Sequence, residues 1–381
     1  MRILPVFLLL TLPALGFAQG AKPKEAFEVA VEQGIEYLAK SQNGDGSWNS
    51  GGGRQPFGMG FGNNAGLRDP AVTALCVMAF LSAGHVPGEG KYGAQIERGV
   101  VFVARQQQQN GMFAANQFGM TQMYSHGICT LMVAEVVGLM PDRQQAEGLR
   151  AQLVKAVRLI RAAQCGRGEK NGGWRYTPDG ADADISVTGW QVMALRAAKN
   201  VGCDVPPEMV ERAVGYIKRC YDPQVGGYRY TNYSPVTVPC TGASILSLEL
   251  CGKEYHASNE SLRAASYLIR KENILNQARP HFFYGIYYTS QAMFQIGDDP
   301  GQAGENRTPN NYWKIYREVL HYLLLTQYPP KPGGYWQSGS PDDNMAGINY
   351  CTAMAILALT VEYRYLPIYQ RGQESDEREG K

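Results

Sequence analysis

The sequence predicts an all-α protein, a single α/α toroid of about six helical hairpins that supply six inner and six outer helices. Three observations carry this prediction. A unit of helix, glycine-rich loop with an aromatic residue, and second helix recurs along the chain; apolar residues follow a helical period; and strand patterns are nearly absent. A repeat of this size with two helices in each copy is typical of stacked helical hairpins.

The copies can be followed from their loop aromatics, which lie 52 to 65 residues apart: Trp48, Phe113, Trp174, Tyr228, Phe283 and Tyr335. The first helices are expected at residues 26–41, 95–106, 149–164, 207–220, from 260 onward, and 312–327. The second helices are expected at residues 71–84, 127–139, 187–200, 242–251, 288–297 and 351–365. Glycines beside the aromatics permit the positive φ angles that tight loops need.

The two helices of each copy differ in composition. The first is amphipathic, as in residues 149–164, whereas the second is rich in small and apolar residues, as in residues 188–195. Helices that are apolar all round belong inside, and charged helices face solvent. Both end copies carry full motifs, unlike the atypical caps of an open solenoid, so we expect the first copy to pair with the sixth and close the ring.

Composition excludes one class of partner. Lys and Arg number 36 against 34 Asp and Glu, so the net charge is only +2. A nucleic-acid binder needs a strong basic excess, so no nucleic-acid partner is expected. With 44% hydrophobic residues in 381, the chain can bury a sizeable core.

The ends of the chain predict export. Residues 1–18 begin with a positive charge, continue with an apolar run and end in small residues, as in a cleaved secretory signal peptide. Residues 24–369 form the predicted toroid domain, and residues 370–381 a polar disordered tail. No later segment has the length of a membrane span, so a periplasmic or extracellular location is expected.

Eight cysteines permit disulfides in an exported chain. Four lie in apolar helical runs and are expected to be free thiols: Cys76, Cys129, Cys240 and Cys351. Better disulfide candidates lie near helix ends: Cys165, Cys203 and Cys220. No CxxC or HExxH motif occurs, so neither a metal nor a cofactor is expected.

The first glycine-rich loop resembles a known repeat motif. Residues 42–48, Gln-Asn-Gly-Asp-Gly-Ser-Trp, match the Q-x3-G-x-W repeat of squalene–hopene cyclases. Most of the chain resembles the prenyltransferase and squalene oxidase repeat group of the terpenoid cyclase and protein prenyltransferase superfamily, and within it a group of exported bacterial proteins. Residues 172–176, 186–195, 287–295 and 352–369 carry that likeness. The motif is specific for the α/α toroid fold and weak for the reaction.

The resemblance to the cyclases implies an acid in an Asp-x-Asp-Asp motif before an inner helix. This chain has Asp182-Ala183-Asp184-Ile185, with Ile in place of the final Asp. The candidate catalytic residues are Asp184, Asp182 and His126. Two carboxyls in a dry site would repel each other and raise one pKa; the alternative is that both aspartates cap the following helix.

The resemblance to zinc prenyltransferases implies Asp, Cys and His at inner-helix starts. Ser186 or Val187 stands at the Cys position, and Tyr350 or Cys351 at the His position. The chain therefore lacks two of three zinc ligands, and that chemistry is not expected.

Residues near the inner-helix starts are expected to line a central cavity: Asp69, Tyr124, Tyr284, Tyr287, Tyr288, Tyr350 and Trp190. Superposed copies place Asp69, Tyr124 and Asp184 in one ring and His126 and Ser186 in the next. Tyrosines give apolar walls with polar tips, suited to a hydrophobic isoprenoid or a glycan. The alternative is that the tyrosines fill a narrow ring centre.

The predicted function is ligand or protein-partner binding in the cavity, without standard cyclase or zinc prenyltransferase chemistry. One alternative is an isoprenoid-processing enzyme with Asp184 as general acid. Another is a polysaccharide-lyase-like toroid with a basic residue and stacking aromatics. Residues for that role are His126, Arg175, Arg229, Trp174, Tyr228 and Tyr230, although the repeated Trp-Arg-Tyr and Tyr-Arg-Tyr are also typical of a packing module.

Overall fold

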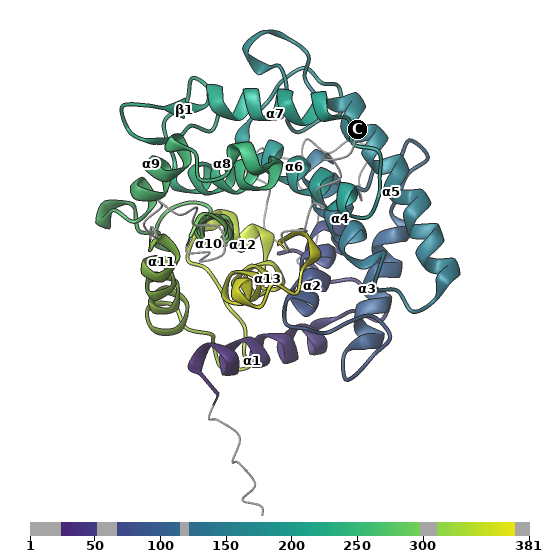
Figure 1. Cartoon of the computed structure of the whole chain (residues 1–381). Coiled ribbons are helices and arrows are strands. Elements are labelled where there is room, and N and C mark those ends of the chain that lie inside the picture. Colours follow the sequence, from purple (N-terminus) through teal and green to yellow (C-terminus); the bar gives the residue numbers. More distant parts are fainter. Residues whose placement is uncertain (1–23, 52–66, 115–121, 298–310, 370–381) are drawn as a thin grey trace, which may run out of the picture.

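The computed structural model describes residues 24–51, 67–114, 122–297 and 311–369. Six outer helices alternate along the chain with six inner helices (Figure 1). The outer helices are α1 (Ala26–Ser41), α3 (Gly93–Arg105), α5 (Arg143–Ala163), α7 (Pro207–Arg219), α9 (Asn259–Leu268) and α11 (Tyr312–His321). The inner helices are α2 (Pro70–Ser82), α4 (Gln122–Val136), α6 (Ile185–Asn200), α8 (Val238–Cys251), α10 (Phe282–Ile296) and α13 (Ile348–Leu359). The predicted all-α class is confirmed.

The inner helices form a closed ring, because each contacts the next in chain order and α13 contacts α2. The boundary between the first and sixth copies is called the seam. Two hydrogen bonds join distant parts of the chain across it. The Thr360 hydroxyl donates to the Ser82 hydroxyl at 2.9 Å, and Ser41 donates to the side chain of Asn349, also at 2.9 Å. The first and sixth copies therefore pair, as predicted.

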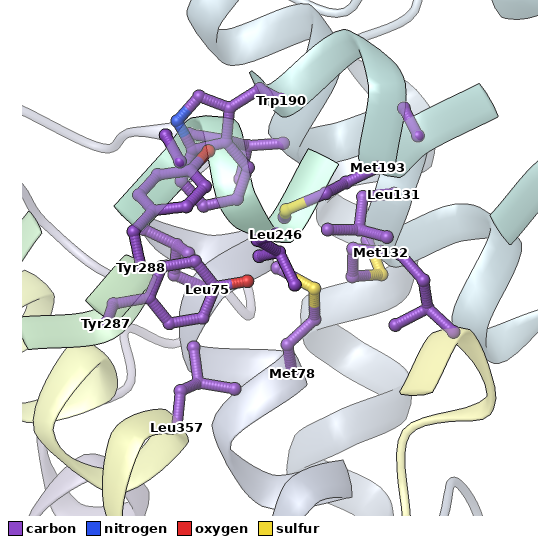
Figure 2. Packing of buried hydrophobic residues seen from close by; sticks show 14 of the residues in the cluster. Leu75, Met78, Leu131, Met132, Trp190, Met193, Leu246, Tyr287, Tyr288 and Leu357 are labelled. Carbon is purple, nitrogen blue, oxygen red and sulfur yellow. The ribbon is translucent and has the colours of Figure 1, made fainter. Parts of the chain in front are cut away.

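The two kinds of helix differ in burial as their compositions require. The outer helix α7 buries one face and leaves its charged face in solvent, whereas α2 buries every residue except Ala71. Side chains from the inner helices meet at the ring centre and fill it (Figure 2). Those labelled there are Leu75, Met78, Leu131, Met132, Trp190, Met193, Leu246, Tyr287, Tyr288 and Leu357. All are buried.

The loop aromatics join the two helices of a hairpin. In the third copy, the buried Trp174 indole donates to the Ile160 carbonyl of the outer helix at 2.8 Å. Its backbone N–H donates to the Thr188 hydroxyl of the inner helix at 3.0 Å. The same pair of bonds recurs at Trp48 and Trp336. These tryptophans therefore hold the two helices of their hairpins together.

The glutamine of the repeat motif links neighbouring copies. The Gln164 side chain donates to the carbonyl of Gly172 in its own loop and to that of Met209 in the next outer helix, both at 2.9 Å. Gln42 and Gln107 make equivalent pairs of bonds. Gly172 has a φ of 98°, and a Cβ there would lie 1.9 Å from the Arg212 carbonyl oxygen. Only glycine permits this close approach of the loop to α7.

Shorter elements complete the described part of the chain. Strands β1 (Tyr221–Asp222) and β2 (Gly227–Tyr228) pair in one antiparallel hairpin. A short helix, α12 (Pro341–Ala346), precedes α13, and a π-helical turn (Tyr322–Gln327) continues α11. The 3₁₀ turns are Gly168–Lys170, Lys253–Tyr255, Lys271–Asn273, Val361–Tyr363 and Pro367–Tyr369. None of the described helices is long and apolar enough to cross a membrane.

Two loop aromatics were assigned wrongly. Phe283 lies inside α10, because Asp343 of α12 accepts its N–H at 3.3 Å and so caps that helix from outside. In the sixth copy, Trp336 makes the repeat's hydrogen bonds, whereas Tyr335 packs against Tyr37 with ring centroids 5.1 Å apart.

All eight cysteines are free thiols. This confirms the expectation for the four helical cysteines, which are all buried. The suggested disulfide candidates are unpaired as well: Cys165, Cys203 and Cys220. The predicted signal peptide and tail lie outside the described residues.

Candidate functional site

Asp184 lies at the start of α6, where its backbone N–H donates to the Trp174 carbonyl. Its side chain is completely buried. One carboxyl oxygen, Oδ1, accepts the Val187 N–H at 2.9 Å and the Ser186 hydroxyl at 2.6 Å. Asp184 therefore caps the helix, as its position before an inner helix predicted.

The second oxygen of Asp184 faces a cation. Its Oδ2 lies 3.3 Å from Nε of Arg175, and neither atom makes a hydrogen bond within the described part of the chain. Burial raises the pKa of Asp184, and the bonds from Ser186 and Val187 and the charge of Arg175 offset only part of that effect. Capping and a raised pKa thus occur together.

Asp182 does not face Asp184 as a second carboxyl. Instead it forms ion pairs with Lys170 and with Arg175, which lies between the two aspartates. Partial burial acts to raise the pKa of Asp182, but these hydrogen bonds and that of the Ala183 N–H lower it overall. Of the two alternatives, repulsion between the carboxyls does not account for the raised pKa of Asp184, because the Arg175 guanidinium lies between the two aspartates.

Arg175 is held by aromatic rings. Its guanidinium carbon lies 5.0 Å from the Tyr176 ring centroid and 5.7 Å from that of Tyr230. The hydroxyls of these two tyrosines hydrogen-bond each other. Such cation–π contacts fix the guanidinium beside Asp184. The repeated Tyr-containing motifs thus pack together, and Trp174 and Tyr228 are wholly buried.

Tyrosines from two other inner helices converge on the same place. The hydroxyl of Tyr124 hydrogen-bonds the Ser186 hydroxyl, and the Tyr284 hydroxyl donates to the Ser186 carbonyl at 3.4 Å. Tyr124, Tyr284 and Tyr350 are only partly buried. Tyr350 of α13 lies near Tyr288, as Tyr124 and Tyr284 do. We define these three tyrosines with Asp184 and Ser186 as the mouth of the ring.

The other tyrosines proposed for the cavity lie deeper. The Trp190 and Tyr287 rings stack with centroids 5.5 Å apart, and Tyr288 packs edge-on against Trp190 (Figure 2). The Tyr287 hydroxyl pairs with that of Tyr369 at 2.9 Å. These side chains fill the ring centre, so they do not line an open central cavity.

His126 has both ring nitrogens engaged. Nδ1 accepts the Phe113 N–H at 3.1 Å, and Nε2 lies 3.2 Å from the Ala156 carbonyl. Burial lowers the pKa of His126 to about 4. When the repeats are superposed, His126 occupies the position of Thr188. The expected register, which paired His126 with Ser186, was therefore wrong by two residues. The geometry supports a structural role for His126.

Asp69 caps α2 by accepting the N–H groups of Ala71 and Val72, and burial raises its pKa. Sequence reasoning missed three buried carboxyls, Glu135, Asp222 and Asp343. Glu135 of α4 accepts the Ile368 N–H at 3.3 Å, and burial raises the pKa of Glu135 to about 8. No group of residues in the described ranges is arranged to hold a metal ion.

A comparison with protein-family profiles finds no match for this chain, and a comparison with curated protein sequences finds none either. Solved structures do match. The GH76A α-1,6-mannanase of Salegentibacter sp. HEL1_6 superposes with a TM-score of 0.62 at 10% identity, over 89% of this chain and 99% of that chain. An inactive variant with two adjacent aspartates replaced, in complex with α-1,6-mannotriose, gives 0.61 at 11% identity, over 87% and 99%.

The type II terpene cyclase MstE from Scytonema is also similar. A variant bound to its product, merosterolic acid A, superposes with a TM-score of 0.57 at 15% identity, over 90% of this chain and 98% of that chain. At these identities the likeness shows the fold alone. The chain thus has the α/α toroid fold shared by both enzymes, and the resemblance drawn from its repeats is confirmed at that level.

Proposed function

We propose that this protein is an exported toroid that binds a glycan at the mouth of its ring. The observation that carries the proposal is the contrast between the two depths of the ring. Apolar side chains fill its centre, whereas at the mouth partly buried tyrosines come together beside a buried carboxyl and an arginine.

The filled centre favours a glycan over an isoprenoid. A long hydrocarbon ligand needs a deep apolar cavity, and Trp190, Tyr287 and Met193 occupy that space. Tyrosine combines an apolar ring with a polar hydroxyl, which suits a sugar, since a sugar has both apolar faces and hydroxyl groups. Both ligand classes occur among the structural neighbours, as α-1,6-mannotriose in the mannanase and geranylgeranyl dihydroxybenzoate in the cyclase.

The test is a titration of the purified protein by calorimetry with a panel of soluble glycans that includes α-1,6-mannotriose, and with geranylgeranyl dihydroxybenzoate. We expect glycan binding that Tyr124→Phe and Tyr284→Phe each weaken by about tenfold, since each loses one hydrogen bond. Tyr322→Phe, at an exposed outer position, is the matched control. Binding of the isoprenoid alone, or glycan binding unchanged in both mouth variants, would refute the proposal.

A second candidate function is proton donation by Asp184 to the bound ligand. The specific observation is that burial raises its pKa while Oδ2 makes no hydrogen bond. A raised pKa favours the protonated form of a carboxyl, which is the form that a general acid needs. The variant Asp184→Asn tests this role.

Export remains part of the proposal and rests on residues 1–18. We expect the mature protein recovered from outside the cytoplasm to begin just after Ala18, as read by intact mass. An N-terminus at Met1 in that fraction would contradict cleavage.

A further inference from the structure

A cavity of about 460 Å³ lies at the seam where the first and sixth copies meet. It lies between residues 49–51 and the junction of α12 with α13. Its volume falls in the range of roughly 300–1,000 Å³ that small-molecule sites occupy. We call it the seam pocket and define it by its polar and aromatic lining: Tyr37, Asn49, Ser50, Gln337, Asn344 and Asn349.

No Asp, Glu, Lys or Arg among the described residues lines the seam pocket. The titratable groups there are Tyr37 and Cys351, and burial raises the pKa of both, which keeps them neutral. A charged ligand would lose water here without gaining a counter-charge. The lining therefore selects for an uncharged ligand.

The amides of the pocket divide into fixed and available groups. Asn349 donates to the Asn49 carbonyl at 3.0 Å and accepts from Ser41, so its side chain is held in place. Gln337 and Asn344 are exposed, and their side-chain amides make no hydrogen bond within the described part of the chain. Amides donate and accept at once, which matches sugar hydroxyls, and the Tyr37 ring offers an apolar face.

The pocket is next to the mouth. Asn349 and Cys351 line the pocket and flank Tyr350 of the mouth in the first turn of α13. We propose that the seam pocket is a second carbohydrate subsite, which holds an uncharged segment of the glycan whose other end binds at the mouth. This inference rests on the proposed function and adds a ligand length and a charge preference to it.

The experiment compares α-1,6-mannotriose with the longer α-1,6-mannohexaose, and adds oligogalacturonides of matched length as charged probes. We expect the wild-type protein to bind the hexaose about tenfold more tightly than the triose and to bind the galacturonides more weakly. The double variant Gln337→Ala, Asn344→Ala should lose the preference for length while its affinity for the triose stays unchanged. Gln145→Ala, an exposed amide on α5, is the control.

These experiments distinguish failure of the seam-pocket proposal from failure of the mouth proposal. If Tyr124→Phe loses glycan binding while the double variant still prefers the longer glycan, the seam pocket is refuted as a subsite and the mouth is supported as the binding site. If the double variant loses the preference for the longer glycan while Tyr124→Phe and Tyr284→Phe bind normally, the pocket is supported as a binding site and the mouth is refuted. A wild-type protein that binds neither mannooligosaccharide, binds both equally, or prefers the galacturonides also overturns the inference. A thermal melt confirms that each variant is folded.

Discussion

Asp184 combines two properties that usually exclude each other. A helix cap accepts backbone N–H bonds, which lowers the pKa of a carboxyl, and Asp184 accepts such a bond through Oδ1. Burial nevertheless raises its pKa overall, although the hydrogen bonds to Oδ1 and the nearby charge of Arg175 act to lower it. The two carboxyl oxygens thus have separate environments: Oδ1 caps the helix, and the buried Oδ2 lies beside Arg175.

Replacing Asp184 by Asn separates these roles. Asn keeps an oxygen for the Val187 N–H, so we expect the free energy of unfolding to change by less than about 1 kcal/mol near neutral pH. Because the folded pKa is raised, the wild type loses stability as pH rises through it, and Asp184→Asn should lose less. Urea unfolding at several pH values measures both effects.

The same variant tests proton donation. If Asp184 gives a proton to the ligand, Asp184→Asn still binds the ligand and turns over several orders of magnitude more slowly. A variant that converts the ligand at the wild-type rate removes this residue as the acid.

Glu135 gives a pH prediction with a definite sign. Its pKa rises from an ordinary 4.5 to about 8 because it is buried, so the unfolded chain ionises first as pH increases. Between those two values Glu135 costs the folded state ~1.4 kcal/mol per pH unit. Glu135→Gln should therefore match the wild type at pH 4 and become increasingly more stable up to about pH 8.

Chemical denaturation across that range provides the measurement. Glu208→Gln, an exposed position on α7, controls for the loss of a carboxyl from the surface. A constant difference between Glu135→Gln and the wild type at all pH values would show that Glu135 is ionised in the folded protein.

At the scale of single residues, the sequence indicates which side chain starts a helix but not what surrounds it. Asp184 could be predicted as a cap because it directly precedes an inner helix. The position of Arg175 between the two aspartates depends on stacking with Tyr230, from a different repeat. Glu135 lies within an otherwise apolar helix, and its partner Ile368 is 233 residues away.

At the scale of elements, each hairpin depends on one aromatic side chain. Trp174→Ala should lower the free energy of unfolding by roughly 3–5 kcal/mol, because it leaves a cavity and frees the Ile160 carbonyl. Trp174→Phe keeps most of the apolar contact and should cost less. Thermal and urea unfolding measure both, and an alanine variant as stable as wild type would contradict a structural role.

The helix pairs could be predicted from periodicity because each pair is local in sequence. The fifth copy could not, since the Phe283 N–H of α10 donates to the side chain of Asp343, which is 60 residues away. Short-range pattern reading therefore placed Phe283 in a loop. Repeats give the order of elements, and contacts between repeats decide where a degenerate element begins.

At the scale of the whole molecule, ring closure makes the repeats interdependent. Thr360→Val removes the hydroxyl that bonds Ser82 and should cost about 1 kcal/mol. Because no repeat is terminal in a closed ring, we expect amide hydrogen exchange to speed up in α6, on the far side, as well as in α2 and α13. Faster exchange confined to α2 and α13 would indicate that the seam opens locally.

Closure could be predicted from the two full-strength end copies, and the filling of the ring centre could not. The same tyrosines are compatible with a lined cavity or a packed core, and the outcome depends on the ring diameter. Six inner helices at this spacing bring Trp190, Tyr287 and Tyr288 into contact (Figure 2).

The seam also sets the order in which the protein can form. Ser41 and Asn349 are separated by 308 residues, so the hydrogen bond between them waits until nearly all of the chain has been synthesised. Early hairpins can pair with their neighbours as they emerge, but the first copy keeps one apolar side exposed until the sixth arrives. The nascent chain is therefore an open arc with an apolar surface exposed at each end. The helix of the ring that is synthesised last covers the helix that is synthesised first.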